Sequence, residues 1–204
     1  MKDIFLIDNL EALRAMSDPL RLRILECLHP EPLTASQVAR KLGQRANKLH
    51  YHVTELERNG LIEAVETRQK GNLLETYYRP VARVFRVDST LFERSSGPEA
   101  LAVFYQNVAT TLDITAADLK ADIEAGKVTE KEAAASLRML LRGRLSPEDV
   151  TEFKQRLSAL ITEFRQRSRE DAPLPIALTL LFYALAPQTA DAEGTDETLP
   201  TPKE

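Results

Sequence analysis

The stretch TASQVARKLGQRANKLHYHVTELERNG, residues 34–60, has the pattern of two short helices joined by a tight turn. Thr34 and Gln37 have the spacing of a capping box, so the first helix is expected to begin there. Gly43 is expected to end it, because glycine readily takes the left-handed conformation that follows many helices. Three apolar residues at i, i+4 and i+7 predict the buried face of the second helix: Leu49, Val53 and Leu56. Two helices in this order, the second one longer, are typical of a helix-turn-helix.

Two more helices are predicted ahead of this stretch. The first spans residues 6–16, and its apolar residues share one helical face: Leu6, Leu10 and Leu13, with Ile7 beside them. The second spans residues 19–28. Asp18 suits the N-cap of this helix, and Pro19 suits its first position, where the missing N–H costs no hydrogen bond. The sequence therefore predicts a cluster of helices around residues 34–60.

The hydrophobic period changes after Gly60. Residues 61–68 and 73–81 have the composition of β-strands and flank the sequence QKGN, in which Gly71 can supply the positive φ of a hairpin turn. A hairpin directly after a helix-turn-helix predicts a wing. Residues 81–88 fit either a further strand or the start of a linking helix, and the sequence leaves both open.

The second half of the chain is predicted to be helical. Helix starts are expected at four places: Pro98, Thr115, Thr129 and Ser146. The last of these helices extends to about residue 170 and carries a long apolar stripe, which needs a partner helix from the same chain or from a second one. Residues 174–187 are too short to span a membrane and favour a buried strand over a short helix.

The predicted fold class is mainly α with a small β-hairpin wing, in three parts. Residues 1–88 are expected to form a winged helix-turn-helix domain. Residues 89–187 are expected to form a helical domain for dimerisation and a possible effector. Residues 188–204 are acidic and poor in apolar groups, which predicts a disordered tail.

Charge is distributed unevenly along the chain. The formal net charge is −4, and the acidic residues of segment 187–204 account for it. Residues 40–86, in contrast, carry ten Lys and Arg side chains against five acidic ones. A local basic surface is what a polyanionic partner such as DNA requires, whatever the charge of the whole chain.

The sequence lacks the features of several classes of protein. A single cysteine, Cys27, allows no intramolecular disulfide. Acids at Asp3, Asp8 and Glu11 interrupt the apolar part of the N-terminal segment, which is unlike a secretory signal. No nucleophile elbow, P-loop, dinucleotide-binding turn or metal triad is present. The sequence therefore predicts a cytoplasmic protein that is not an enzyme, needs no cofactor and does not enter a membrane.

The polar side of the second helix predicts contacts to DNA. In helix-turn-helix proteins, the N-terminal portion of this helix enters the major groove. Asparagine can bind adenine through two hydrogen bonds, and arginine or lysine can bind guanine or phosphate. Two basic residues at the tip of the hairpin could reach a neighbouring minor groove. The predicted DNA-binding residues are Arg45, Asn47, Lys48, His50, Tyr51, Thr54, Arg68 and Lys70.

A metal site at the two histidines of this helix is not expected. His50 and His52 are two residues apart, so their side chains diverge by about 200° and cannot hold one ion together. His50 is expected to lie to one side of the helix. His52 is expected to be half covered beside the buried face.

The N-terminal part resembles the ArsR-type winged helix-turn-helix family of bacterial transcriptional regulators. The family stretch D-P-x-R-L-x-I-L is matched by Asp18, Pro19, Arg21, Leu22, Ile24 and Leu25. The recognition-helix pattern V-S-H-H-L-x-x-L is matched loosely by Leu49, His50, Tyr51, His52, Val53 and Leu56, and the ending G-L-V by Gly60, Leu61 and Ile62. The resemblance covers about residues 5–88. It implies a homodimer that binds double-stranded DNA, usually as a repressor that an effector releases.

One departure from the family pattern concerns metals. Metal-sensing members carry a C-x-C element in the helix before the recognition helix, and this chain has ASQVARKLG there, with neither thiol nor imidazole. The helical second half resembles the longer, non-metal-sensing branch. The resemblance thus predicts a homodimeric repressor that reads a partly palindromic operator with residues 46–59. The alternative is an adaptor that uses a winged helix to bind protein, and salt dependence distinguishes the two.

Overall fold

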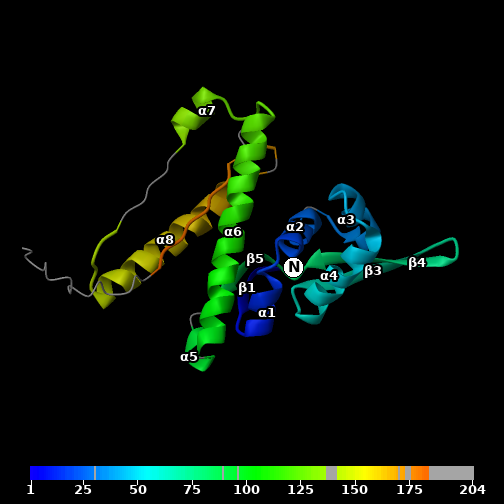
Figure 1. Cartoon of the computed structure of the whole chain (residues 1–204), viewed down its shortest axis with the longest axis horizontal. Helices are drawn as coiled ribbons and strands as arrows, with labels where there is room; N and C mark the ends of the chain where they lie inside the picture. The colour runs from blue at the N-terminus through cyan, green and yellow to red at the C-terminus, as the bar shows by residue number, and fades with distance from the viewer. Residues whose placement is uncertain are drawn as a thin grey trace, which may run out of the picture. The chain divides into compact units, whose positions relative to one another are not determined.

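The structure is a computed structural model that describes residues 1–29, 31–88, 90–95, 97–136, 142–169, 171–172 and 176–183. Contacts within the chain divide it into two compact units, Met1–Arg138 and Met139–Glu204. Every described strand and most of the helices belong to the first unit (Figure 1). The predicted fold class, mainly helical with a hairpin wing, is confirmed. The domain boundaries at residues 88 and 187 stay a prediction.

Three short helices precede α4 (Ala46–Arg58), and each begins at a side-chain cap. They are α1 (Leu10–Ala15), α2 (Pro19–Leu28) and α3 (Ala35–Lys41). Asn9 accepts a hydrogen bond from the first turn of α1, and Asp18 does the same for α2. Thr34 and Gln37 form a reciprocal capping box at α3. The predicted starts at Asp18 and Thr34 are therefore confirmed.

The helix predicted over residues 6–16 is wrong in its first part. Residues Lys2–Ile7 form strand β1, which pairs in parallel with β5 (Ala82–Val87), and α1 begins only at Leu10. A short continuous apolar run, such as residues 4–7, fits a helix or a strand, and the distant partner strand decides between them. The same pairing resolves the open choice at residues 81–88 in favour of a strand.

The wing is a three-stranded sheet in the order β2-β4-β3. Its antiparallel strands are β2 (Leu33–Thr34), β3 (Ile62–Lys70) and β4 (Leu73–Pro80). Gly71 has a φ of 61° in the β3–β4 turn, so the predicted hairpin and its glycine are confirmed. A register shift between Ala64 and Glu66 marks an irregularity in β3. The two-residue strand β2 is too short to be predicted from sequence.

The core of the first unit lies among α1, α2, α3, α4 (Ala46–Arg58) and the base of the sheet. Its largest fully buried aliphatic side chains include Ile7, Leu13, Ile24, Leu28, Val38, Leu49, Leu56, Leu61 and Leu91. Because these residues come from elements that precede and follow α4 in the chain, α4 is fixed against a single hydrophobic core.

Helix α6 (Pro98–Glu124) is longer than the sequence predicted. Its start at Pro98 is confirmed, but the second start at Thr115 is wrong. Thr115 lies inside the helix, and its hydroxyl donates to the carbonyl oxygen of Thr111 at 2.9 Å. A Thr-x-x-Asp sequence caps a helix only where the preceding residues leave the helical conformation, and here they do not.

The short helices α5 (Leu91–Arg94) and α7 (Glu130–Ala135) flank α6. The helix start predicted at Thr129 is confirmed, because the backbone N–H of Thr129 donates a hydrogen bond to the Glu132 carboxylate.

The second unit contains helix α8 (Pro147–Arg167), which begins at the predicted capping box of Ser146 and Asp149. None of the residues of α8 is buried. The strand predicted over 174–187 is wrong for residues 176–183, which have no regular secondary structure. A strand needs a partner for its backbone groups, and no described strand pairs with this segment. The predicted disordered tail, 188–204, lies outside the described residues. Within the described ranges, no helix is long and apolar enough to cross a membrane.

Candidate nucleic-acid interface

The buried face of α4 anchors the candidate interface. Leu49, Val53 and Leu56 are 0%, 3% and 0% exposed, which confirms the predicted inner face. Through this face α4 packs against α1, α2, α3 and β3. Burying an aliphatic side chain contributes about 1.5–3 kcal/mol, so three of them hold the orientation of the helix firmly.

The opposite face of α4 is polar and open to solvent. Asn47, Tyr51 and Thr54 repeat the spacing of the buried residues, displaced by two positions, and so lie about 200° around the helix from them. Lys48 and His50 flank this line. All five side chains are exposed. The structure thus brings together five of the eight predicted site residues on one side of α4.

The N-terminal end of α4 adds positive potential to this face. Arg45 occupies the N-cap position in an extended conformation, and its side chain makes no capping hydrogen bond. Neither Arg45 nor Lys48 forms an ion pair within the described part of the chain. The unpaired N–H groups of the first turn and the helix dipole also favour an anion there. Both cations are therefore available to a phosphate.

The two predicted site residues of the wing are engaged differently. The Arg68 guanidinium donates two hydrogen bonds of 2.6 Å to the carboxylate of Glu66, and it lies over the Tyr77 ring at 4.6 Å. The hydrogen bonds from Arg68 lower the pKa of Glu66. Lys70 lies 3.4 Å from a carboxylate oxygen of Glu75. The positive charges at the wing tip are thus paired with acids of the wing itself, although all four side chains reach solvent.

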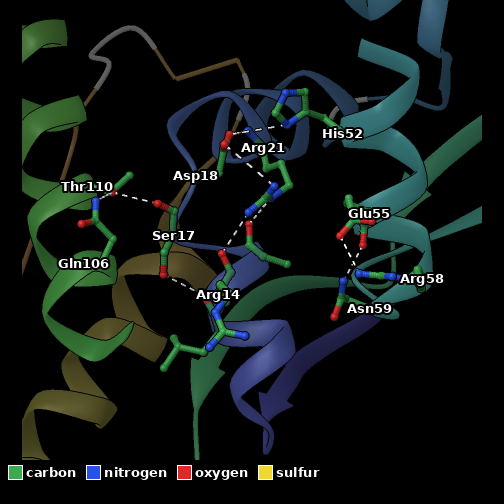
Figure 2. Close-up of polar contacts among 12 residues, drawn as sticks. Arg14, Ser17, Asp18, Arg21, His52, Glu55, Arg58, Asn59, Gln106 and Thr110 are labelled. Carbon is green, nitrogen blue, oxygen red and sulfur yellow. Dashed lines mark hydrogen bonds and ion pairs between the residues drawn. The ribbon is translucent and has the colours of Figure 1, made fainter. Parts of the chain in front are cut away.

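The burial of His52 differs from the sequence-based prediction. Its residue is 8% exposed, so it is buried, and it is not half covered as the sequence predicted. The Nδ1 atom has no hydrogen-bond partner within the described residues and lies 3.7 Å from Oδ1 of Asp18 (Figure 2). Burial lowers the pKa of His52; the Asp18 carboxylate opposes this shift, and Arg21 and Lys48 reinforce it. The imidazole is therefore mainly neutral at pH 7.

Arg21 connects His52 and Asp18 to the end of α1. The guanidinium donates to the carbonyl oxygens of Ala15 and Arg14, and it lies 3.8 Å from the Asp18 carboxylate. Asp18 was expected only to cap α2, and Arg21 only to match a family pattern. No local signal in the sequence indicates that either residue lies near the recognition helix, because the contact joins segments about thirty residues apart in the chain.

A metal centre finds no support in the geometry. Among the described residues, no three His, Cys, Asp or Glu side chains lie close enough to hold an ion. Cys27 is a half-buried free thiol, and burial raises its pKa. Its thiolate form is thus disfavoured at neutral pH.

Comparisons with known proteins agree with this geometry. A family model described as a helix-turn-helix domain matches residues 16–65. The transcriptional regulator HlyU of Vibrio vulnificus is 30% identical, with 36% of this chain and 71% of that chain covered and a TM-score of 0.30. Reduced HlyU of Vibrio cholerae is 26% identical, with 36% and 72% covered and a TM-score of 0.30. No curated protein matches the chain.

A third similar structure is the homodimeric winged helix-turn-helix DNA-binding domain Mb0332 of Mycobacterium bovis, described as a possible ArsR-family transcriptional regulator. It is 19% identical, with 53% of this chain and 76% of that chain covered and a TM-score of 0.29. The family model covers α2, α3 and α4 and the start of β3. Residues 16–65 therefore form a helix-turn-helix domain, as the resemblance to ArsR-type winged helix-turn-helix regulators predicts.

Proposed function

We propose that this regulator is a homodimeric repressor that reads a partly palindromic operator through the exposed face of α4. The observation that carries the proposal is the polar edge formed by Arg45, Asn47 and Lys48. These side chains are exposed at the N-terminal end of a helix whose opposite face is fully buried. Such an edge suits the major groove, where asparagine reads adenine and cations bind guanine or phosphate.

The dimer proposal is supported by a long apolar stripe on α6. Its members are Leu101, Tyr105, Leu112, Leu119 and Ile123, which are between 45% and 72% exposed. They lie about opposite the helix face that packs on α1 and α2, where Ala100, Val103 and Thr110 are buried. An exposed apolar stripe of this length on a soluble regulator is expected to pack against another surface, and a second copy of the chain provides that surface. A two-fold axis then presents two α4 helices to half-sites about one turn of DNA, roughly 34 Å, apart.

Repression is the proposed action, and it is supported by the argument that a dimer bound across an operator excludes polymerase from the DNA beneath it. Regulators of this family are typically not enzymes. A small-molecule effector in the helical half stays a prediction.

Selection from fragments of genomic DNA with the purified protein tests the function. Repeated rounds are expected to enrich fragments that share a partly palindromic sequence. Binding to an enriched fragment should weaken steeply between about 50 and 200 mM salt, because each phosphate contact releases counterions. No enrichment, or binding that salt does not change, would contradict DNA reading and favour a protein-binding adaptor. Light scattering at micromolar concentration should give the mass of a dimer, and a monomer would contradict the two-fold arrangement.

The wing provides a further expected result. Glu66→Gln should raise the affinity for the selected operator and steepen its salt dependence by about one phosphate contact, because the Arg68 guanidinium loses its carboxylate partner. Salt titration of binding measures both effects. Glu63→Gln is the matched control, since Glu63 pairs with Arg79 at 2.8 Å nearer the base of the wing. If Glu66→Gln and Glu63→Gln bind alike, the wing tip does not approach the DNA backbone.

A further inference from the structure

Helix α6 is attached to the junction between α1 and α2 by polar contacts. The side-chain amide of Asn107 donates to the carbonyl oxygen of Met16 at 3.2 Å. The hydroxyl of Thr110 donates to the carbonyl oxygen of Ser17 at 3.0 Å (Figure 2). Thr110 is 2% exposed and also accepts a hydrogen bond from Gln106. Two consecutive carbonyl groups of the junction are thus held from the same face of α6.

The junction is attached in turn to the recognition helix. Ser17 is buried, and its hydroxyl donates to the carbonyl oxygen of Leu13 in α1 at 2.8 Å. The next residue, Asp18, caps α2 and lies 3.7 Å from Nδ1 of His52. His52 is on α4, one turn after Lys48. The charged groups that face the imidazole are Asp18, Arg21, Lys48 and Glu55. A displacement of residues 16–18 therefore changes what His52 contacts.

We propose that Asn107 and Thr110 are positioning residues for DNA recognition, and that they act on α4 through residues 16–18 and His52. The proposal rests on the proposed operator binding. Under this proposal, α6 has two functional faces. One face holds the junction, and the opposite face carries the exposed apolar stripe.

Thr110→Val tests this proposal, because valine keeps the shape of threonine and removes the donor. The fragment selected by the wild-type protein serves as probe, and the melting temperature is measured in parallel. Operator binding by Thr110→Val is expected to weaken by about 2- to 30-fold, the range of mutations that alter coupling between sites. Thr110→Ser keeps the hydroxyl and should restore wild-type binding. Thr111→Val is the matched control, because the exposed Thr111 hydroxyl bonds only the backbone of its own helix, at the carbonyl of Asn107, among the described contacts.

A double-mutant cycle separates positioning from simple loss of stability. Thr110→Val and His52→Gln are combined, and operator binding is measured for both single variants and the pair. If the two residues act along one route, the losses are not additive, whereas independent effects add. If Thr110→Val folds poorly, Asn107→Ala replaces it in the double-mutant cycle.

Three outcomes decide the matter. Wild-type affinity in Thr110→Val, with the operator still bound, overturns the inference and leaves the proposed function standing. Additive losses in the cycle also overturn it. Failure of the wild-type protein to select any DNA overturns both the inference and the proposed function.

Discussion

Replacement of Asn47 by alanine is expected to relax base preference at one position of each operator half-site by about 1–3 kcal/mol. The asparagine side chain is exposed in the first turn of α4 and lies opposite the buried face of the helix. Its amide can pair with adenine through two hydrogen bonds, and alanine offers neither. Binding to a set of operators that differ at single positions measures the effect. Because Asn47 is not part of the core, the melting temperature should stay that of the wild type.

Lys48→Ala is the natural comparison, since the two residues are adjacent on one helix. Lysine at this place forms no ion pair among the described residues, so it is expected to bind phosphate. Its loss should weaken binding to all sequences alike and reduce the salt slope by about one. If Asn47→Ala instead acts uniformly, or both variants bind every sequence as the wild type does, then α4 is not the reading element.

Most of the DNA-binding fold could be predicted because its signals are local. The capping box of Thr34 and Gln37, the cap at Asp18 and the turn glycine Gly71 depend on residues within a few positions of each other. The buried face of α4 follows from helical spacing alone. The exposure of the predicted α4 residues follows from the same spacing, since residues opposite a buried stripe face solvent. Whether these residues touch DNA stays a prediction.

What could not be predicted depends on contacts between distant segments. The last two residues of β1, Leu6 and Ile7, were expected to be helical, because only the pairing with β5 makes this segment a strand. Thr115 has a capping sequence, but the helix around it continues. His52 sits at the margin of the apolar face, and its burial depends on how closely α2 approaches α4. The Lys70–Glu75 ion pair and the placement of Arg68 over the Tyr77 ring likewise require the strand register of the hairpin. The spacing of residues along the chain predicts which face of a helix or strand a side chain occupies. The element that packs against that face, which can be distant in the sequence, determines what the side chain contacts.

Leu56→Ala is expected to produce the largest loss of stability among the changes considered, about 2–5 kcal/mol, because it leaves a cavity in a fully buried site. Leu56 also lies where α4 meets the sheet, since its carbonyl oxygen accepts a hydrogen bond from the N–H of Leu61 at 2.9 Å. Denaturant unfolding followed by circular dichroism measures the change. Glu57→Ala, at the next and exposed position, is the control and should stay within about 0.5 kcal/mol of the wild type.

The size of this loss tests the assumption on which the interface depends. If the core under α4 fixes the recognition helix, Leu56→Ala should weaken operator binding as well, even at temperatures where the protein remains folded, because the helix can then shift against its support. Amide exchange in α4 should rise in the same variant before the whole unit unfolds. A variant that loses several kcal/mol yet binds the operator with wild-type affinity would mean that DNA itself orders α4. The exposed edge of Arg45, Asn47 and Lys48 would then form on binding and would not be preorganised by the hydrophobic core.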